Sequence, residues 1–99
     1  MNDATIAAIM AVSDSLQAAW QAASAELKAI SGVGTGPMGI TPDAVKFSPE
    51  YRKAHYKAEC ARLAVHSFRK TYRKVIEKES KARIAAKRAA ITQSMESAQ

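Results

Sequence analysis

The chain has 99 residues and a formal charge of +6, from 15 Lys and Arg against 9 Asp and Glu. This length allows one small domain. The sequence lacks the regular turn signals of a β-sandwich and the strand–helix alternation of a doubly wound fold, so it excludes both classes and predicts an all-α protein.

The first predicted element is a helix over residues 3–31, with Asp3 as its N-cap. Its apolar residues recur at alternating spacings of three and four, the pattern of a helix that lies along another helix. This first seam consists of Ile6, Ile9, Ser13, Leu16, Trp20, Ala23, Leu27 and Ile30. Ser31 and Gly32 are expected to end the helix.

Residues 32–42 hold all four glycines and two of the three prolines, which predicts a loop. A short helical turn is expected over 42–47, with Thr41 as its cap and Pro42 in its first position. Ser48, followed by Pro49 and Glu50, is a stronger signal of the same kind. It predicts that a longer helix begins at Pro49.

This second helix is expected to run without interruption over 49–92 and to end in a frayed tail over 93–99. The segment contains no Gly or Pro after Pro49 and is rich in Ala, Lys, Arg and Glu, which are strong helix formers. Its second seam consists of Tyr51, Ala54, Ala58, Ala61, Val65, Phe68, Tyr72 and Val75. The two seams together predict an antiparallel helical hairpin, with Trp20 buried against Ala58 and Ala61.

The hairpin leaves an overhang, because the first helix would be about 42 Å long and the second about 65 Å. An isolated helical overhang either frays or packs on another chain. We therefore expect a homo-oligomer, a dimer or larger, built as a coiled coil or a helix bundle. The candidate self-association residues are Tyr56, Cys60 and Leu63, which share a stripe opposite the seam, and Ile84 and Ile91 in the overhang.

The positive charge lies almost entirely in the second helix, where residues 50–88 carry 13 Lys and Arg against four Glu. His55, Glu59, Arg62, His66, Arg69 and Arg73 recur at helical spacing on one flank of the seam, and Arg52, Lys70, Lys74, Lys78 and Lys81 cover the far side. The candidate partner-binding residues are Arg62, His66, Arg69, Lys70, Arg73 and Lys74. Repeated cations suit a phosphate backbone or an acidic protein surface, and they are also typical of a simply solvated face.

No catalytic, metal or cofactor site is expected. Cys60 is the only cysteine, so it forms no internal disulfide. His55 and His66 lie off its stripe of the helix, so a histidine that activates Cys60 as a nucleophile would have to come from another chain. His55 and Glu59 are spaced as metal ligands, but no second cluster completes a site. The glycine run 32–39 lacks the Gly-Lys-Ser/Thr ending of a phosphate-binding loop. No segment has the character of a signal peptide or of a spanning helix, so a cytoplasmic protein with no membrane partner is expected.

The segment Gly39-Ile40-Thr41-Pro42-Asp43-Ala44-Val45-Lys46, followed by Ser48-Pro49-Glu50-Tyr51, resembles small helical open reading frames of tailed bacteriophages and prophages. Such proteins often read Gly-Leu-Thr-Pro-Asp, then a Pro-Glu-Tyr/Trp helix start, then a basic helix. The resemblance covers residues 36–75. It implies an accessory protein in a bacterial host cell, and many such proteins bind host proteins without being enzymes. It carries over no site residues.

The leading functional expectation is therefore a non-enzymatic phage-type accessory protein. It would bind and inhibit a host protein with an acidic surface, such as a defence component, in the way anti-CRISPR proteins do. The first alternative is a nucleic-acid-binding protein that uses the basic second helix. The second alternative is a structural coiled-coil or scaffold piece, which needs only the two seams.

Overall fold

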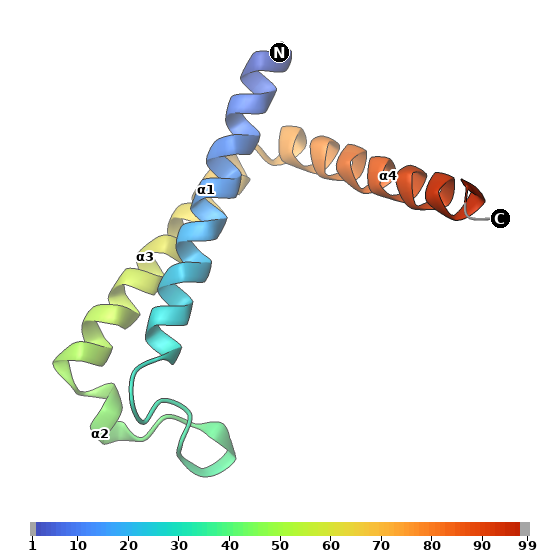
Figure 1. Ribbon diagram of the computed structural model, residues 1–99. Coiled ribbons are helices and arrows are strands. Elements are labelled where there is room, and N and C mark those ends of the chain that lie inside the picture. Colours follow the sequence, from blue (N-terminus) through green and yellow to red (C-terminus); the bar gives the residue numbers. More distant parts are fainter. Residues whose placement is uncertain (1, 98–99) are drawn as a thin grey trace.

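The computed structural model describes residues 2–97, and within this range it contains helices and no strands (Figure 1). The order of elements is α1 (Asp3–Lys28), the short 3₁₀ turn η1 (Pro37–Gly39), α2 (Asp43–Lys46), α3 (Pro49–Thr71) and α4 (Arg73–Ser97). The prediction of an all-α protein is confirmed.

Helix α1 begins at Asp3, the predicted first residue, but its N-cap is one residue earlier than expected. The side chain of Asn2 accepts a hydrogen bond from the backbone N–H of Thr5 at 2.8 Å, so Asn2 and not Asp3 is the N-cap. Asp3 lies in the first turn instead, where its negative charge interacts favourably with the helix dipole. The helix ends at Lys28, three residues before the expected boundary.

The loop after α1 closes on itself through backbone contacts. The N–H of Gly36 donates to the carbonyl of Ile40 at 2.8 Å, and a Cβ added at Gly36 would overlap that carbonyl, so only glycine fits. The hydroxyl of Thr41 accepts from the N–H of Gly34 at 3.1 Å. Thr41 therefore stabilises the loop, and the prediction that it caps the next helical turn is wrong: α2 has no side-chain cap.

Helix α3 begins where the sequence predicts. The hydroxyl of Ser48 accepts from the N–H of Tyr51 at 3.2 Å and also donates to the carbonyl of Val45 at 2.7 Å. Pro49 occupies the first helical position, where a missing N–H costs nothing. This one serine thus links the end of α2 to the start of α3.

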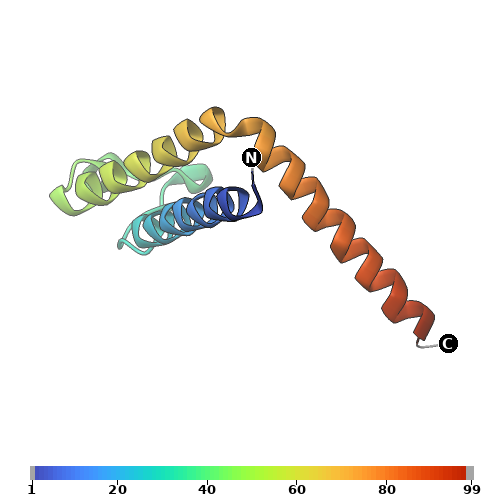
Figure 2. The same ribbon diagram turned by 90° about the horizontal axis from the view of Figure 1, so that it is seen from above.

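Helices α1 and α3 lie side by side and run in opposite directions (Figures 1 and 2). Lys57 pairs with Glu26 at 2.9 Å near the loop end, and Arg69 donates to Gln17 at 2.9 Å nearer the other end. Every residue of both predicted seams is buried or half-buried. The fully buried residues are Ile9, Met10, Ser13, Ala23, Ala58 and Val65, of which only Met10 lies outside the seams.

Trp20 is half-buried, so the expectation that it is buried is wrong. Its ring lies 5.9 Å from the ring of His66, at an interplanar angle of 57°. The reason is that the structure is only one layer of helices thick. Two helices can enclose small side chains between them, but the large indole extends past the edge of their interface. Trp20 therefore packs partly on the flank of α3.

The predicted continuous helix over 49–92 is broken at Tyr72, which has φ −110° and ψ 27°. Just before this residue, the hydroxyl of Thr71 donates to the carbonyl of Ser67 at 3.0 Å, a contact that commonly bends helices. The rings of Phe68 and Tyr72 pack with their centroids 4.7 Å apart. We call this break the bend. Beyond it α4 points away from the other two helices (Figure 2).

Helix α4 contains no buried residue, and its described part is helical through Ser97. The expected frayed tail over 93–99 is therefore helical over 93–97, and residues 98–99 lie outside the described range. About three turns along α4, Arg83 reaches Asp14 of α1 at 3.4 Å. None of the described helices is both long and apolar enough to cross a bilayer.

The molecule is a single layer of helices. Its radius of gyration is 19.3 Å and its extents are 55 × 40 × 17 Å. A compact chain of this length has a radius of gyration of about 13 Å. Most side chains are therefore open to solvent, and the surface available for binding is large relative to the mass.

Candidate functional site

The predicted basic flank runs along α3 into the first turn of α4, and its arginines form ion pairs or hydrogen bonds with other side chains of the protein. Arg62 pairs with Glu59 at 2.9 Å, and Arg73 pairs with Glu77 at 3.0 Å across one turn of α4. Arg69 donates to Gln17 of α1. The arginines on this flank are therefore partly satisfied, and two of the three are neutralised by neighbouring carboxylates.

The pair Glu59–Arg62 is the clearest electrostatic feature of α3. Hydrogen bonding from the Arg62 guanidinium lowers the pKa of the Glu59 carboxyl, and the nearby His55 acts in the same direction. The same hydrogen bonds raise the pKa of Arg62. Both groups stay charged at neutral pH, so they form a locally neutral segment in the middle of the basic flank.

The bend brings most of the predicted partner-binding residues together. A hollow of about 360 Å³ opens there, and it is lined by His66, Arg69, Lys70, Arg73, Ile76 and Glu77. An adjoining hollow of about 500 Å³ is shared by Lys70, Arg73 and Lys74. Five of the six predicted residues therefore gather at the bend, and Arg62 lies apart from it beside Glu59.

Several cations form no ion pair within residues 2–97, Lys28, Lys46, Arg52 and Lys53 among them, and the longest periodic series of such cations lies beyond the flank. Lys74, Lys78, Lys81 and Arg88 are exposed and recur at spacings of four, three and seven, so they share one face of α4. Lys70 precedes them across the bend. We call this set the lysine face: Lys70, Lys74, Lys78, Lys81 and Arg88. In the described part of the chain, every ion pair involves other cations.

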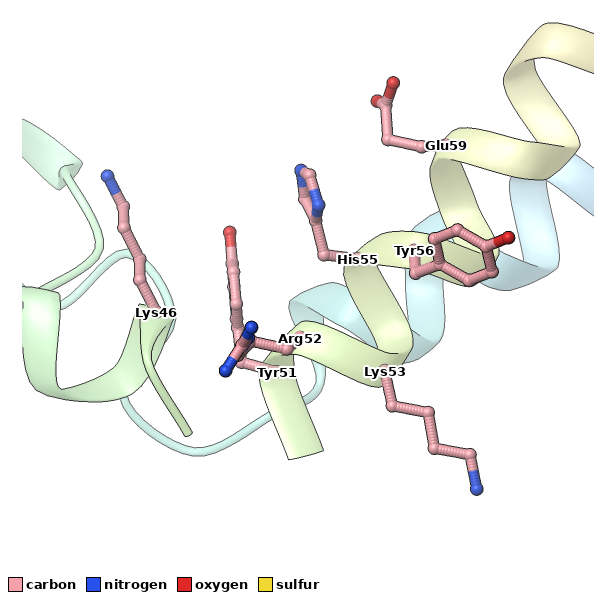
Figure 3. Close-up of a pocket in the computed structure, with 7 residues that line it drawn as sticks. All are labelled: Lys46, Tyr51, Arg52, Lys53, His55, Tyr56 and Glu59. Atoms are coloured by element: carbon pink, nitrogen blue, oxygen red, sulfur yellow. The ribbon is translucent and has the colours of Figure 1, made fainter. Parts of the chain in front are cut away.

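A second hollow, of about 890 Å³, opens at the start of α3 (Figure 3). Its lining residues are Lys46, Tyr51, Arg52, Lys53, His55, Tyr56 and Glu59. The rings of Tyr51 and His55 are stacked, with centroids 5.8 Å apart and an interplanar angle of 16°. In Figure 3 the side chains of Lys46, Tyr51 and His55 extend on the same side, whereas Tyr56 points away from them.

Sequence reasoning did not identify this hollow. The available signal was the spacing of four between Tyr51 and His55, which brings two rings together on a helix. Tyr51 was instead assigned to the apolar seam, where it is in fact half-buried. The contribution of Lys46 depends on how α2 is placed beside α3, which no spacing in the sequence indicates.

The predicted self-association residues are all exposed, and they fall in two places. Tyr56, Cys60 and Leu63 lie on α3, with Tyr56 73% and Leu63 54% exposed, while Ile84 and Ile91 lie on α4. Hydrogen bonding with the Cys60 side chain raises the pKa of the Tyr56 phenol. The two sets lie on different sides of the bend, so they do not form one continuous apolar surface.

Within residues 2–97 no group of three or more His, Cys, Asp or Glu side chains is placed to hold a metal ion. Comparisons of the chain with protein-family models, with curated proteins and with solved structures give no match. The candidate surfaces are therefore interpreted below from their geometry and charge.

Proposed function

We propose that this protein binds nucleic acid through its phosphate backbone, using the lysine face of α4 and the bend. The observation that carries the proposal is the separation of two kinds of cation. The arginines of the flank form ion pairs or hydrogen bonds with the protein itself, whereas the cations of the lysine face form no ion pair in the described chain. Free, repeated cations bind polyanions by releasing condensed counterions.

The residue types favour a phosphate backbone over an acidic protein surface. Four of the five residues are lysines, and lysine is depleted in protein–protein interfaces, where arginine is enriched. Lys74 to Arg88 span about 21 Å of helix. With no buried residue, α4 can approach a nucleic acid on several sides, and a helix about 10–12 Å wide fits the major groove of B-form DNA.

The test is titration of labelled 20-base-pair duplexes of unrelated sequence at several salt concentrations. Wild-type affinity should be similar for all sequences. Five phosphate contacts give a slope of about −4.5 in log affinity against log salt, at about −0.9 for each contact. In the double variant Lys74→Gln/Lys78→Gln we expect a slope shallower by about two and weaker binding to every duplex.

The matched control is Lys28→Gln/Lys57→Gln, which removes the same charge from exposed lysines of α1 and α3 that do not line the hollows at either end of α3. It should keep the wild-type slope, because Lys57 already pairs with Glu26 and neither residue is on the lysine face. Equal losses in the two double variants would mean that net charge alone drives binding, and the proposal would be wrong.

Inhibition of a host protein in a phage setting stays a prediction and is the competing proposal. Its surface would be the hollow at the bend, where Arg69 and Arg73 present guanidinium groups to an acidic side chain. Binding of that kind should depend on one or two arginines. The double variant Arg69→Lys/Arg73→Lys should abolish it, because lysine lacks the bidentate guanidinium fork, whereas phosphate binding should persist.

We also propose that α1 and α3 act as a helical hairpin and that α4 is an arm that associates with a second copy. An isolated helix is only marginally stable in water, and Ile84 and Ile91 are 51% and 60% exposed. Pairing of two arms would cover these residues and leave the lysine faces accessible. The corresponding experiment is the truncation described in the Discussion.

A further inference from the structure

We infer that the hollow at the start of α3 is a stacking site for an unpaired base, so that the protein prefers single strands to duplexes. This inference rests on the proposed function but concerns a different surface. The hollow lies at the opposite end of α3 from the bend, and none of its lining residues belongs to the lysine face.

The first support is the pair of aromatic rings. Tyr51 and His55 lie nearly parallel, at 16°, and stack face to face with their centroids 5.8 Å apart, so the outer face of the Tyr51 ring is turned toward Lys46 (Figure 3). Aromatic side chains of this kind bind single-stranded nucleic acid because every base has a π-face that stacks on them. A duplex cannot use such a site without unstacking a base.

The second support is the charge around the rings. Lys46 extends beside Tyr51 from α2, and Arg52 follows Tyr51 in α3 (Figure 3). Neither cation forms an ion pair with a described residue. The one carboxylate in the hollow, Glu59, is paired with Arg62 at 2.9 Å. The aromatic surface is thus flanked by free cations, an arrangement that suits a base and its phosphate together.

The third support is size and position. The volume of about 890 Å³ lies within the range of ligand-binding hollows, about 300–1,000 Å³. Tyr51 and Lys74 are separated by about 34 Å of helix. About ten stacked nucleotides of one strand cover that length. One strand can therefore contact both the stacking site and the lysine face.

The experiment compares a 20-nucleotide single strand, carrying one 2-aminopurine, with the same sequence as a duplex. Stacking should quench the fluorescence of the single strand on binding, and the wild-type protein should bind the single strand about tenfold more tightly than the duplex. In His55→Ala and in Tyr51→Leu this preference should fall to about twofold or less, and the quenching should be lost.

Phe47→Leu is the matched control. Phe47 is an exposed aromatic residue next to Lys46 in the sequence, but it does not line the hollow. It should keep both the preference and the quenching. Because His55 is exposed, His55→Ala should retain the helical circular dichroism signal, which confirms that a loss of binding is local.

The outcomes separate the two proposals. Equal affinity for single strand and duplex, lost in Lys74→Gln/Lys78→Gln, overturns the stacking site and leaves the proposed function intact. Single-strand binding that needs His55 but not the two lysines overturns the proposed function and leaves the stacking site intact. A lack of binding to either oligonucleotide overturns both.

Discussion

The α1–α3 pair and α4 are built from helices of similar length but differ in how they are stabilised. Helices α1 and α3 bury a shared seam, with Ile9, Ser13 and Ala23 of α1 and Ala58 and Val65 of α3 among its buried residues. Helix α4 has the same helix-forming residues but no buried side chain. Helix formation therefore depends on composition, whereas the position of a helix depends on an apolar face that another element can cover.

This difference also divides the molecule by role. In the α1–α3 pair, cations such as Lys57 and Arg69 contact groups on the neighbouring helix. In α4 most cations have no such neighbour, and they remain available to a partner. A helix with no buried side chain and few tertiary contacts also opens more easily, so α4 should lose amide protection before α1 and α3.

The largest expected effect comes from a charge placed in the seam. Val65 is 1% exposed, so Val65→Asp should destabilise the fold by about 4 kcal/mol or more, because an unpaired carboxylate is buried. Gln93→Asp, at an exposed position of α4 on the other side of the helix from Ile84 and Ile91, should change the free energy of unfolding by less than about 0.5 kcal/mol. Urea unfolding followed by circular dichroism measures both. Similar losses would mean that α4 is packed after all.

A larger side chain in the seam should have a smaller effect. Ala58 is 7% exposed between α1 and α3, and Ala58→Leu should cost about 1–3 kcal/mol because the interface has no room for three further carbons. Ala86→Leu on α4 meets only solvent and should be close to neutral. Thermal unfolding of the two variants gives the comparison. A neutral Ala58→Leu would contradict close packing of the two helices.

Loss of the cap of α3 should have a moderate effect. Ser48→Ala removes the acceptor for the Tyr51 N–H and should destabilise the protein by about 1 kcal/mol. Ser94→Ala, at an exposed position of α4, serves as the control and should have no measurable effect. Equilibrium unfolding distinguishes the two, and equal stability of both variants would show that Ser48 is dispensable.

The smallest effect on stability is expected from removing the arm. After residues 84–99 are deleted, the remaining α1–α3 pair should be a monomer. Its unfolding midpoint should equal that of the same pair in the full chain, because the deleted segment has no buried side chain in the described structure. Light scattering at tens of micromolar protein reports assembly. The full chain should be a dimer or larger. A monomeric truncation assigns association to α4, a surviving oligomer assigns it to Tyr56, Cys60 and Leu63, and a monomeric full chain contradicts self-association.

Much of the fold could be predicted from local patterns. The seams located the α1–α3 interface because a 3–4 spacing places residues on one face whatever the surroundings. Ser48 was identified as a cap because a serine before a proline satisfies free N–H groups locally. Thr41 offered the same chemistry but bonds Gly34 instead, because the folded loop brings that N–H within reach.

The candidate sites could be predicted only in part. Spacing correctly placed Lys74, Lys78 and Lys81 on one face, but it could not distinguish free cations from paired ones. That distinction depends on where the carboxylates lie in space: Glu26 reaches Lys57 from another helix, and Asp14 reaches Arg83 across the bend. Pairs of this kind join residues 31 and 69 positions apart.

Helix content, the apolar seams and the concentration of charge follow from the sequence, because each is a local or periodic property of the chain. The direction of α4 is different. Residues around Tyr72 are compatible with a continuous helix, and both sides of the bend have good helix formers. The break itself is marked by local contacts, from Thr71 to Ser67 and between Phe68 and Tyr72, but the direction of α4 beyond it depends on contacts with α1, such as the pair of Arg83 with Asp14, which exist only once the helices are assembled.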